Sequence, residues 1–232
     1  TGVITFSNDA CAGFLLNEEL TALSKVKENA KSSIAVLGGA KISTKLSLID
    51  SLSKTVDKVI LGGGIANTCL AAKGYEVGKS LIEDSMLEEA KELITNPKIL
   101  IPESVIVSLS ADEPGRITSA NSIQENEAIF DIAPDSFVDL EPIIMNAGTI
   151  LWNGPIGFFE KENFFAGTAM IAEMIISSKG FSVAGGGDTI SAAEKAGVLD
   201  SLDYVSTAGG AFLEFMEGKK LPALEALIDK VN

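Results

Sequence analysis

Short apolar runs alternate along the chain with segments whose apolar positions recur every three or four residues. The runs are typical of buried strands, and the longer period is typical of helices that cover a sheet. Apolar runs predict strands at residues 33–37, 56–61, 99–101, 105–109, 128–131, 149–153, 181–184 and 204–206. Helical periods predict helices near residues 12–29, 41–52, 65–73, 87–93, 134–146, 163–177, 190–196, 211–216 and 221–231.

The regular alternation of strands and helices predicts the fold class. It favours an α/β fold, doubly wound into three layers, α/β/α, around a mainly parallel, Rossmann-like sheet. Residues 110–127 are polar and contain a turn, so we expect a surface excursion there. The strand at 128–131 and the helix at 134–146 are expected to continue the alternation.

Glycine turns follow four of the predicted strands, at residues 38–39, 62–64, 185–187 and 209–210. In a doubly wound sheet the carboxyl ends of the strands share one edge, and ligands bind there. A glycine turn before a helix leaves backbone N–H groups free to bind an anion. Together the four turns predict an anion-binding edge, although the last one alone is also explained as a tight entry into a helix.

Two lysines, Lys41 and Lys45, follow the first glycine turn. They are four residues apart, so on the first turn of a helix both ammonium groups would point the same way. Cations at the start of a helix oppose its dipole, and a bound polyphosphate would explain them. The alternative is a solvated lysine pair after an ordinary turn.

Three polar groups follow other strands at the same edge. Asp188 comes directly after a glycine triplet, where it is either the N-cap of the next helix or a magnesium ligand. Thr189 next to it offers a hydroxyl to a phosphate. Glu160 follows the strand that contains the tryptophan, and it either accepts hydrogen bonds from ribose hydroxyls or is a solvated loop carboxylate.

The composition narrows the function classes. The chain has 232 residues and a net charge of −14, which argues against a nucleic-acid surface and against binding to an anionic membrane. Histidine is absent and Arg116 is the only arginine, so this chain offers no histidine base and almost no guanidinium clamp. Cys11 and Cys69 lack metal-ligand spacing, and we expect buried structural thiols in a reducing compartment.

No apolar run approaches the length of a membrane span, and no signal peptide is visible, so a cytoplasmic location is expected. No coiled-coil or long apolar seam is visible either, which favours a monomer. The first residue is Thr1, and we expect the chain to be processed or to be the back part of a longer protein.

Two other nucleotide motifs fit poorly. Residues 74–80 nearly spell a P-loop, but Lys73 stands where its first glycine belongs and the preceding segment is predicted to be helical. A dinucleotide-binding dehydrogenase domain is disfavoured because no Gly-x-Gly-x-x-Gly follows a strand with an acidic residue about 20 positions later.

Six motifs in series resemble the C-terminal half of phosphoglycerate kinase, over about residues 10–232. They occur in the family's order, at residues 38–45, 62–68, 74–80, 152–160, 185–189 and 206–211. The resemblance implies a glycolytic phosphotransferase that moves a phosphoryl group between 1,3-bisphosphoglycerate and Mg-ADP, giving 3-phosphoglycerate and ATP. In that family the C-terminal domain holds the nucleotide, so ADP or ATP with Mg²⁺ is the implied ligand.

The resemblance also implies roles for residues at matching positions. The residues implied to contact phosphates or the phosphoryl group in flight are Lys41, Lys45, Gly209 and Gly210. The residues implied to line the nucleotide cleft or to border phosphates, base and ribose are Gly39, Gly63, Gly64, Asn153, Pro155, Glu160, Gly186, Gly187 and Thr189. Asp188 is implied to hold the magnesium ion.

The family pattern also predicts how the chain is divided. Residues 1–10 would be a remnant of the preceding domain, residues 11–30 the interdomain connector helix, and residues 31–232 the nucleotide-binding domain. Ala208 departs from the pattern, because the family has a glycine there. The N-terminal domain with its basic phosphoglycerate site is absent from this sequence, so we expect nucleotide binding without turnover. The alternative is a non-catalytic nucleotide-binding or regulatory module.

Overall fold

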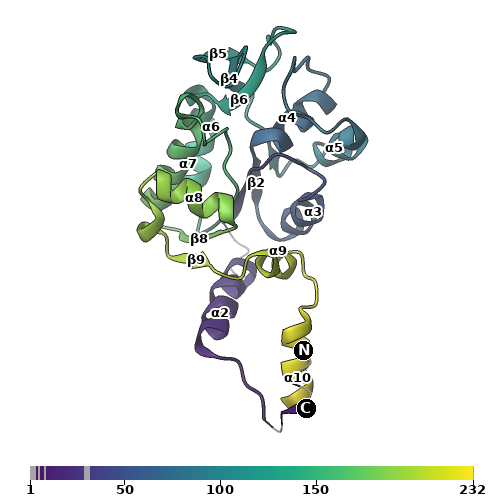
Figure 1. Cartoon of the computed structure of the whole chain (residues 1–232), viewed down its shortest axis with the longest axis vertical. Helices are drawn as coiled ribbons and strands as arrows, with labels where there is room; N and C mark the ends of the chain where they lie inside the picture. Colours follow the sequence, from purple (N-terminus) through teal and green to yellow (C-terminus); the bar gives the residue numbers. More distant parts are fainter. Residues whose placement is uncertain (1–3, 5, 8, 29–31, 232) are drawn as a thin grey trace.

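The computed structural model describes residues 4, 6–7, 9–28 and 32–231, and a six-stranded parallel sheet forms its centre (Figure 1). Its strands are β1 (Ser33–Leu37), β2 (Lys58–Leu61), β3 (Ile99–Leu100), β7 (Thr149–Asn153), β8 (Phe181–Gly185) and β9 (Tyr204–Ser206). All five residues of β1 and of β7 are buried, as expected of parallel strands covered on both faces. The predicted α/β class with a mainly parallel sheet is confirmed.

The strand order is β3-β2-β1-β7-β8-β9, so the winding direction reverses between β1 and β7. Leu37 pairs with Asn153 in this central parallel pair. The predicted glycine turns follow β1, β2, β8 and β9, and therefore all lie at the carboxyl edge of the sheet. In open α/β sheets this reversal creates a crevice in which ligands bind.

Helices cover both faces of the sheet. The first face packs against α2 (Phe14–Glu28), α3 (Leu46–Thr55), α4 (Gly63–Ala72), α5 (Leu87–Leu93) and α9 (Gly210–Met216). The second face packs against α6 (Phe137–Met145), α7 (Ala166–Ser177) and α8 (Gly187–Lys195). Along β1, Ala35 and Leu37 belong to the first core while Ile34 and Val36 belong to the second, which follows from the alternation of side chains along a strand.

A second, antiparallel sheet was not predicted. It has the order β5-β4-β6 and consists of β4 (Ser104–Ser108), β5 (Arg116–Ser119) and β6 (Ala128–Ile132). The expectation that the strand at 128–131 continues the alternation is therefore wrong, because β6 pairs antiparallel with β4 outside the main sheet. β5 lies inside the expected polar excursion, and the excursion also contains the buried Ala120 and Glu127. A third core of α4 and this sheet holds it against the domain.

Most other predicted elements agree with the structure within a few residues. The main exception is the helix after β1, which begins at Leu46 and not near Lys41. Thr44 Oγ1 donates to the carbonyl of Lys41 at 2.8 Å, and the N–H of Lys45 donates to Ile42 at 2.9 Å, so this segment is a turn. Hydroxyl residues that bond to nearby backbone favour such turns over helix.

The helix predicted at residues 12–29 is confirmed as α2, although residue 29 lies outside the described residues. Residues 1–3, 5, 8 and 30 of the predicted remnant and connector also lie outside them. The last helix, α10 (Pro222–Val231), agrees with its prediction. Cys11 is exposed, which contradicts the expected burial, whereas Cys69 is buried as expected.

α2 is tied to the last strand through a buried carboxylate. Glu19 accepts hydrogen bonds from Ser206 Oγ at 3.0 Å, from the Thr207 N–H at 2.6 Å and from Thr207 Oγ1 at 3.0 Å.

In Figure 1, α2 and α10 lie at the end of the molecule opposite to the small sheet. No helix in the described part of the chain has the length and apolar character needed to cross a bilayer.

Candidate functional site

A cavity of about 460 Å³ lies at the carboxyl edge of the sheet, where the winding reverses. Six predicted site residues line it: Gly39, Gly63, Gly64, Pro155, Glu160 and Asp188. They come from the turns after β1, β2 and β7 and from the first turn of α8. The sheet therefore brings together residues that are far apart in the sequence, and Glu160 is exposed at this cavity.

The turns approach one another so closely that only glycine fits. A Cβ at Gly38 would lie 1.8 Å from the carbonyl oxygen of Pro155, and a Cβ at Gly64 would lie 2.2 Å from that of Ala40. Gly63 has φ +64°, which disfavours a side chain, and its N–H donates to Ile156 at 2.9 Å. These contacts fix the turns after β1, β2 and β7 relative to one another.

Lys45 lies half-buried among these turns, although it is not one of the residues that line the cavity. Lys45 Nζ donates to the carbonyl oxygens of Gly38 at 2.6 Å and Asn153 at 2.9 Å. Burial lowers its pKa to about 8, while the nearby Asp188 carboxylate acts in the opposite direction. A cation held by two carbonyls at the ends of adjacent strands is a favourable partner for a phosphate oxygen.

Two other predicted residues lie below the surface next to the cavity. Thr189 Oγ1 accepts from the Gly154 N–H at 2.7 Å and donates to Gly185 at 2.7 Å, so its hydroxyl is not free for a phosphate. Asn153 Nδ2 donates to Gly185 at 2.5 Å, whereas its buried Oδ1 has no hydrogen-bond partner. A buried unpaired amide oxygen in the described structure marks a place where a donor is missing.

The first turn of α8 excludes one of the two interpretations of Asp188. The N-cap of α8 is Gly186, which has φ +98°, so the expectation of Asp188 as N-cap is wrong. Asp188 is exposed and lines the cavity beside the open position at Gly187. In the described part of the chain no group of three or more potential ligands gathers into a resident metal site. A single free carboxylate fits a magnesium ion that arrives with phosphate oxygens and waters.

Lys41, Gly209 and Gly210 do not line the cavity. Lys41 is exposed on the turn before α3, so the expectation that it points the same way as Lys45 from a helix is wrong. Glu83 holds this turn by accepting from the Ser43 N–H at 2.9 Å and from Ser43 Oγ at 2.7 Å. Gly209 and Gly210 are exposed where β9 passes into α9.

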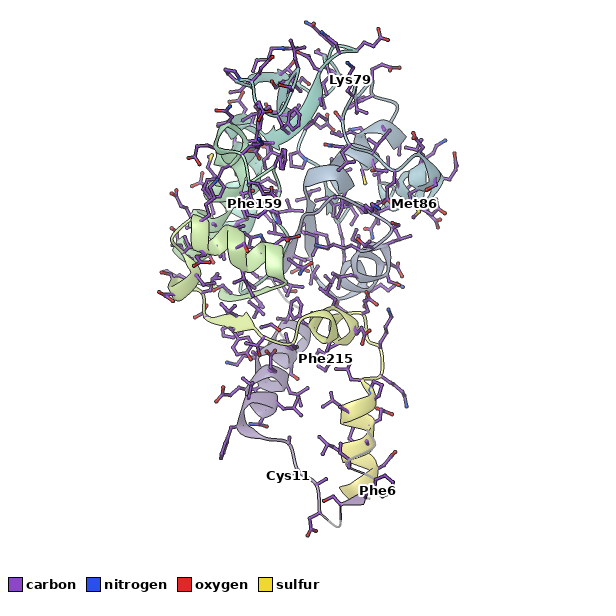
Figure 2. The ribbon with its side chains drawn as sticks, in the orientation of Figure 1. Phe6, Cys11, Lys79, Met86, Phe159 and Phe215 are labelled. Carbon is purple, nitrogen blue, oxygen red and sulfur yellow. The ribbon has the colours of Figure 1, made fainter. Side chains whose placement is uncertain are left out.

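The sequence did not predict the second wall of the cavity, which is apolar. Its side chains come from α4, from the segment before α5 and from the small sheet, and include Leu70, Leu81, Val105, Ile129 and Phe130. Figure 2 shows Phe159, from the wall after β7, close to α8, and Lys79 toward the small sheet. An apolar wall opposite glycine turns gives the cavity one side for a flat ring and one for an anion.

The segment after β7 is held by residues that carry no motif. Lys195 Nζ of α8 donates to the carbonyl of Phe159 at 2.8 Å. Thr168 Oγ1 of α7 accepts from the N–H groups of Ile156 and Gly157, both at 3.2 Å. These two residues belong to the site because α7 and α8 lie next to this edge of the sheet. Their placement is visible in the tertiary fold and not in a sequence motif.

Comparisons with known proteins agree on one family. A family model for phosphoglycerate kinase matches residues 1–219. The structure of phosphoglycerate kinase from Coxiella burnetii is similar over 100% of this chain, with a TM-score of 0.95 and 44% identity. The enzyme from Pyrococcus horikoshii OT3 is similar over 94%, with a TM-score of 0.82 and 32% identity. This chain spans only 61% and 57% of the lengths of those two chains. The chain belongs to the phosphoglycerate kinase family.

Proposed function

We propose that this chain binds Mg-ADP and Mg-ATP as the nucleotide-binding part of a phosphoglycerate kinase. The observation that carries the proposal is the cavity at the sheet reversal, which joins the glycine turns, Glu160 and Asp188 to an apolar wall. The apolar wall suits a nucleobase, Glu160 suits ribose hydroxyls, and the glycine turns suit phosphates.

The phosphate side supplies charge without a nucleophile. Phosphoryl transfer needs positioning and dispersed positive charge more than covalent chemistry. Lys45 lies between the ends of β1 and β7, and rotation away from the carbonyls of Gly38 and Asn153 would bring its ammonium group to a phosphate oxygen. Asp188 would hold the magnesium ion of the nucleotide, which neutralises phosphate charge when bound.

In this proposal the site for phosphoglycerate, the second substrate, belongs to another part of the protein. The chain has no histidine, and its one arginine, Arg116, is paired with Glu127 through two hydrogen bonds of 2.6 Å. A basic patch for phosphoglycerate would therefore come from the N-terminal part that the relatives possess. Lys41, Gly209 and Gly210 lie outside the cavity and would contact the transferred phosphoryl group from that side.

Calorimetric titration with ADP, with and without magnesium, tests the proposal. We expect saturable binding that magnesium strengthens, and no binding of NADH. Asp188→Asn is expected to remove the magnesium effect while binding of metal-free ADP remains. Asp200→Asn, which changes a carboxylate of a short helix after α8 that does not line the cavity, is the matched control and should behave as the wild type. A folded chain that binds no ADP would contradict the proposal.

A further inference from the structure

A buried carboxyl group, Asp131, lies in the cavity wall between two backbone segments. It is 1% exposed, and Oδ2 accepts a hydrogen bond from the Gly167 N–H at 2.8 Å, while Oδ1 accepts from Ile132 at 2.9 Å. A Cβ at Gly157 would lie 2.0 Å from Oδ1, and a Cβ at Gly167 would lie 2.3 Å from it. The carboxyl group therefore packs directly against both the segment after β7 and the first turn of α7.

The pairing register of the small sheet changes at this point. Ile106 pairs with Asp131 and Val107 pairs with Ile129, so Phe130 is an extra residue in β6. Such bulges redirect side chains and recur next to active sites. Here Phe130 and Asp131 both line the cavity, although consecutive strand residues normally point to opposite faces.

The first turn of α7 also fixes the segment that follows β7, through hydrogen bonds to its backbone. Thr168 follows Gly167, and its buried hydroxyl accepts from the Ile156 and Gly157 N–H groups. From the other side, the Phe158 N–H donates to Phe130 at 2.7 Å, and the rings of these two residues stack 6.1 Å apart. Asp131 thus fixes the helix turn that fixes residues 155–160.

We infer that Asp131 is a positioning residue that sets the placement of Pro155 and Glu160 through Gly167 and Thr168. The inference rests on the proposed function, because it assigns residues 155–160 to the base and ribose of a nucleotide. Within the described residues, neither the glycine turns after β1 and β2 nor the Lys45 ammonium group forms a hydrogen bond with Asp131. Loss of the carboxylate therefore acts first on the nucleoside side and more weakly on the phosphate side, which meets residues 155–160 through the Gly63 N–H bond to Ile156.

The test compares two ligands in calorimetric titrations of the 232-residue chain: Mg-ADP, which has a nucleoside, and Mg-pyrophosphate, which has none. Asparagine has one acceptor oxygen in place of two, so Asp131→Asn loses the bond to Gly167 or to Ile132. We expect its dissociation constant for Mg-ADP to rise about tenfold, while that for Mg-pyrophosphate stays within about twofold of the wild-type value.

Asp203→Asn is the matched control. Asp203 also accepts hydrogen bonds from backbone and hydroxyl groups, from Ser182 N–H at 2.8 Å and Ser182 Oγ at 2.9 Å, but it does not line the cavity. It should change neither constant. If Asp131→Asn does not fold, Thr168→Val carries the same test, with the same ligand-selective loss expected, and Thr168→Ser should restore ADP binding because it keeps the hydroxyl.

Three outcomes separate the possibilities. Unchanged Mg-ADP binding by a folded Asp131→Asn chain would overturn the inference. Equal weakening of both ligands would overturn it as well, because it would mean a general loss of stability. A wild-type chain that binds Mg-pyrophosphate but not Mg-ADP, or neither ligand, would contradict the proposed function itself.

Discussion

Lys45 shows how burial prepares one side chain for pH-dependent binding. Its pKa is lowered to about 8 because the ammonium group is buried between two strand ends. Binding to a polyanion needs the protonated form, so Mg-ADP affinity should fall as the pH rises through about 8. Titrations at pH 7 and pH 9 measure this, and Lys45→Met should bind weakly and equally at both.

The exposed Lys54 on α3 provides the control for this pH effect, because it pairs with Asp50 on the same helix and lies outside the cavity. Lys54→Met should keep the wild-type pH profile. Equal wild-type affinity at pH 7 and pH 9 would show that the Lys45 ammonium group is not part of the binding site.

Asp131 should also give the folded chain a characteristic pH dependence. Burial raises its pKa from 3.8 to about 7, against the effect of its two backbone hydrogen bonds. Between these values the folded state binds the proton and the unfolded state does not, so the free energy of unfolding falls as the pH rises from about 4 to about 7. Urea unfolding at pH 5 and pH 7.5 should show this fall in the wild type and a smaller one in Asp131→Asn. Identical pH slopes in the two proteins would contradict the assignment.

At the scale of elements, two glycines at these turns should affect different properties: one the stability of the fold, the other the binding of the nucleotide. A methyl group at Gly64 would lie 2.2 Å from the carbonyl oxygen of Ala40, so Gly64→Ala should force the start of α4 away from the turn after β1. We expect it to lower the free energy of unfolding by about 1–3 kcal/mol.

Gly187 gives the opposite prediction. A Cβ there meets nothing within 4 Å, and alanine favours the helix, so Gly187→Ala should keep or raise the stability by up to about 1 kcal/mol. It should nevertheless weaken Mg-ADP binding, because the added methyl group enters the space beside Asp188. Urea unfolding and calorimetry on both variants check the pair, and a destabilised Gly187→Ala chain would refute it.

Periodicity predicted most elements because the buried strands and amphipathic helices each follow one simple spacing. It missed the antiparallel sheet, since an apolar run such as β4 does not reveal which strand it pairs with. It placed Lys41 and Lys45 on a helix because the hydrogen bonds of the turn were not visible in the pattern. Thr168 and Asp131 are single polar residues in apolar segments. The partners that link them to the site, Ile156, Gly157 and Gly167, are 11 to 36 positions away, so the sequence alone gave no reason to assign them to it.

At the scale of the whole molecule, Glu19 links the helix α2 to the end of β9. Glutamine removes the negative charge that accepts from the Thr207 N–H and the two hydroxyl groups, and it replaces one acceptor oxygen by an amide donor, so Glu19→Gln should cost about 1–3 kcal/mol. Hydrogen exchange of the Thr207 amide should rise together with exchange in α2. Glu18→Gln, at an exposed position on the same helix, is the control, and equal effects of the two variants would contradict the link.

An experiment in which this chain is mixed with a second protein part distinguishes a catalytic part of a kinase from a non-catalytic binding module. If the chain is the nucleotide-binding part of a kinase, adding the separately produced N-terminal part of a phosphoglycerate kinase should restore measurable phosphoryl transfer. The chain alone should show none. Nucleotide binding without any restored transfer would favour the binding-module alternative.

The small sheet enters the chain as one excursion between β3 and β7, and it supplies much of the apolar wall of the cavity. In the proposed function this excursion contacts the nucleobase. It is one continuous segment of the sequence, and the glycine turns that would contact the phosphates lie in other segments. Residues 104–132 from a relative with another purine preference could be grafted between the same two strands. We expect such a chimera to show the donor's base selectivity while the phosphate contacts of the host stay unaltered.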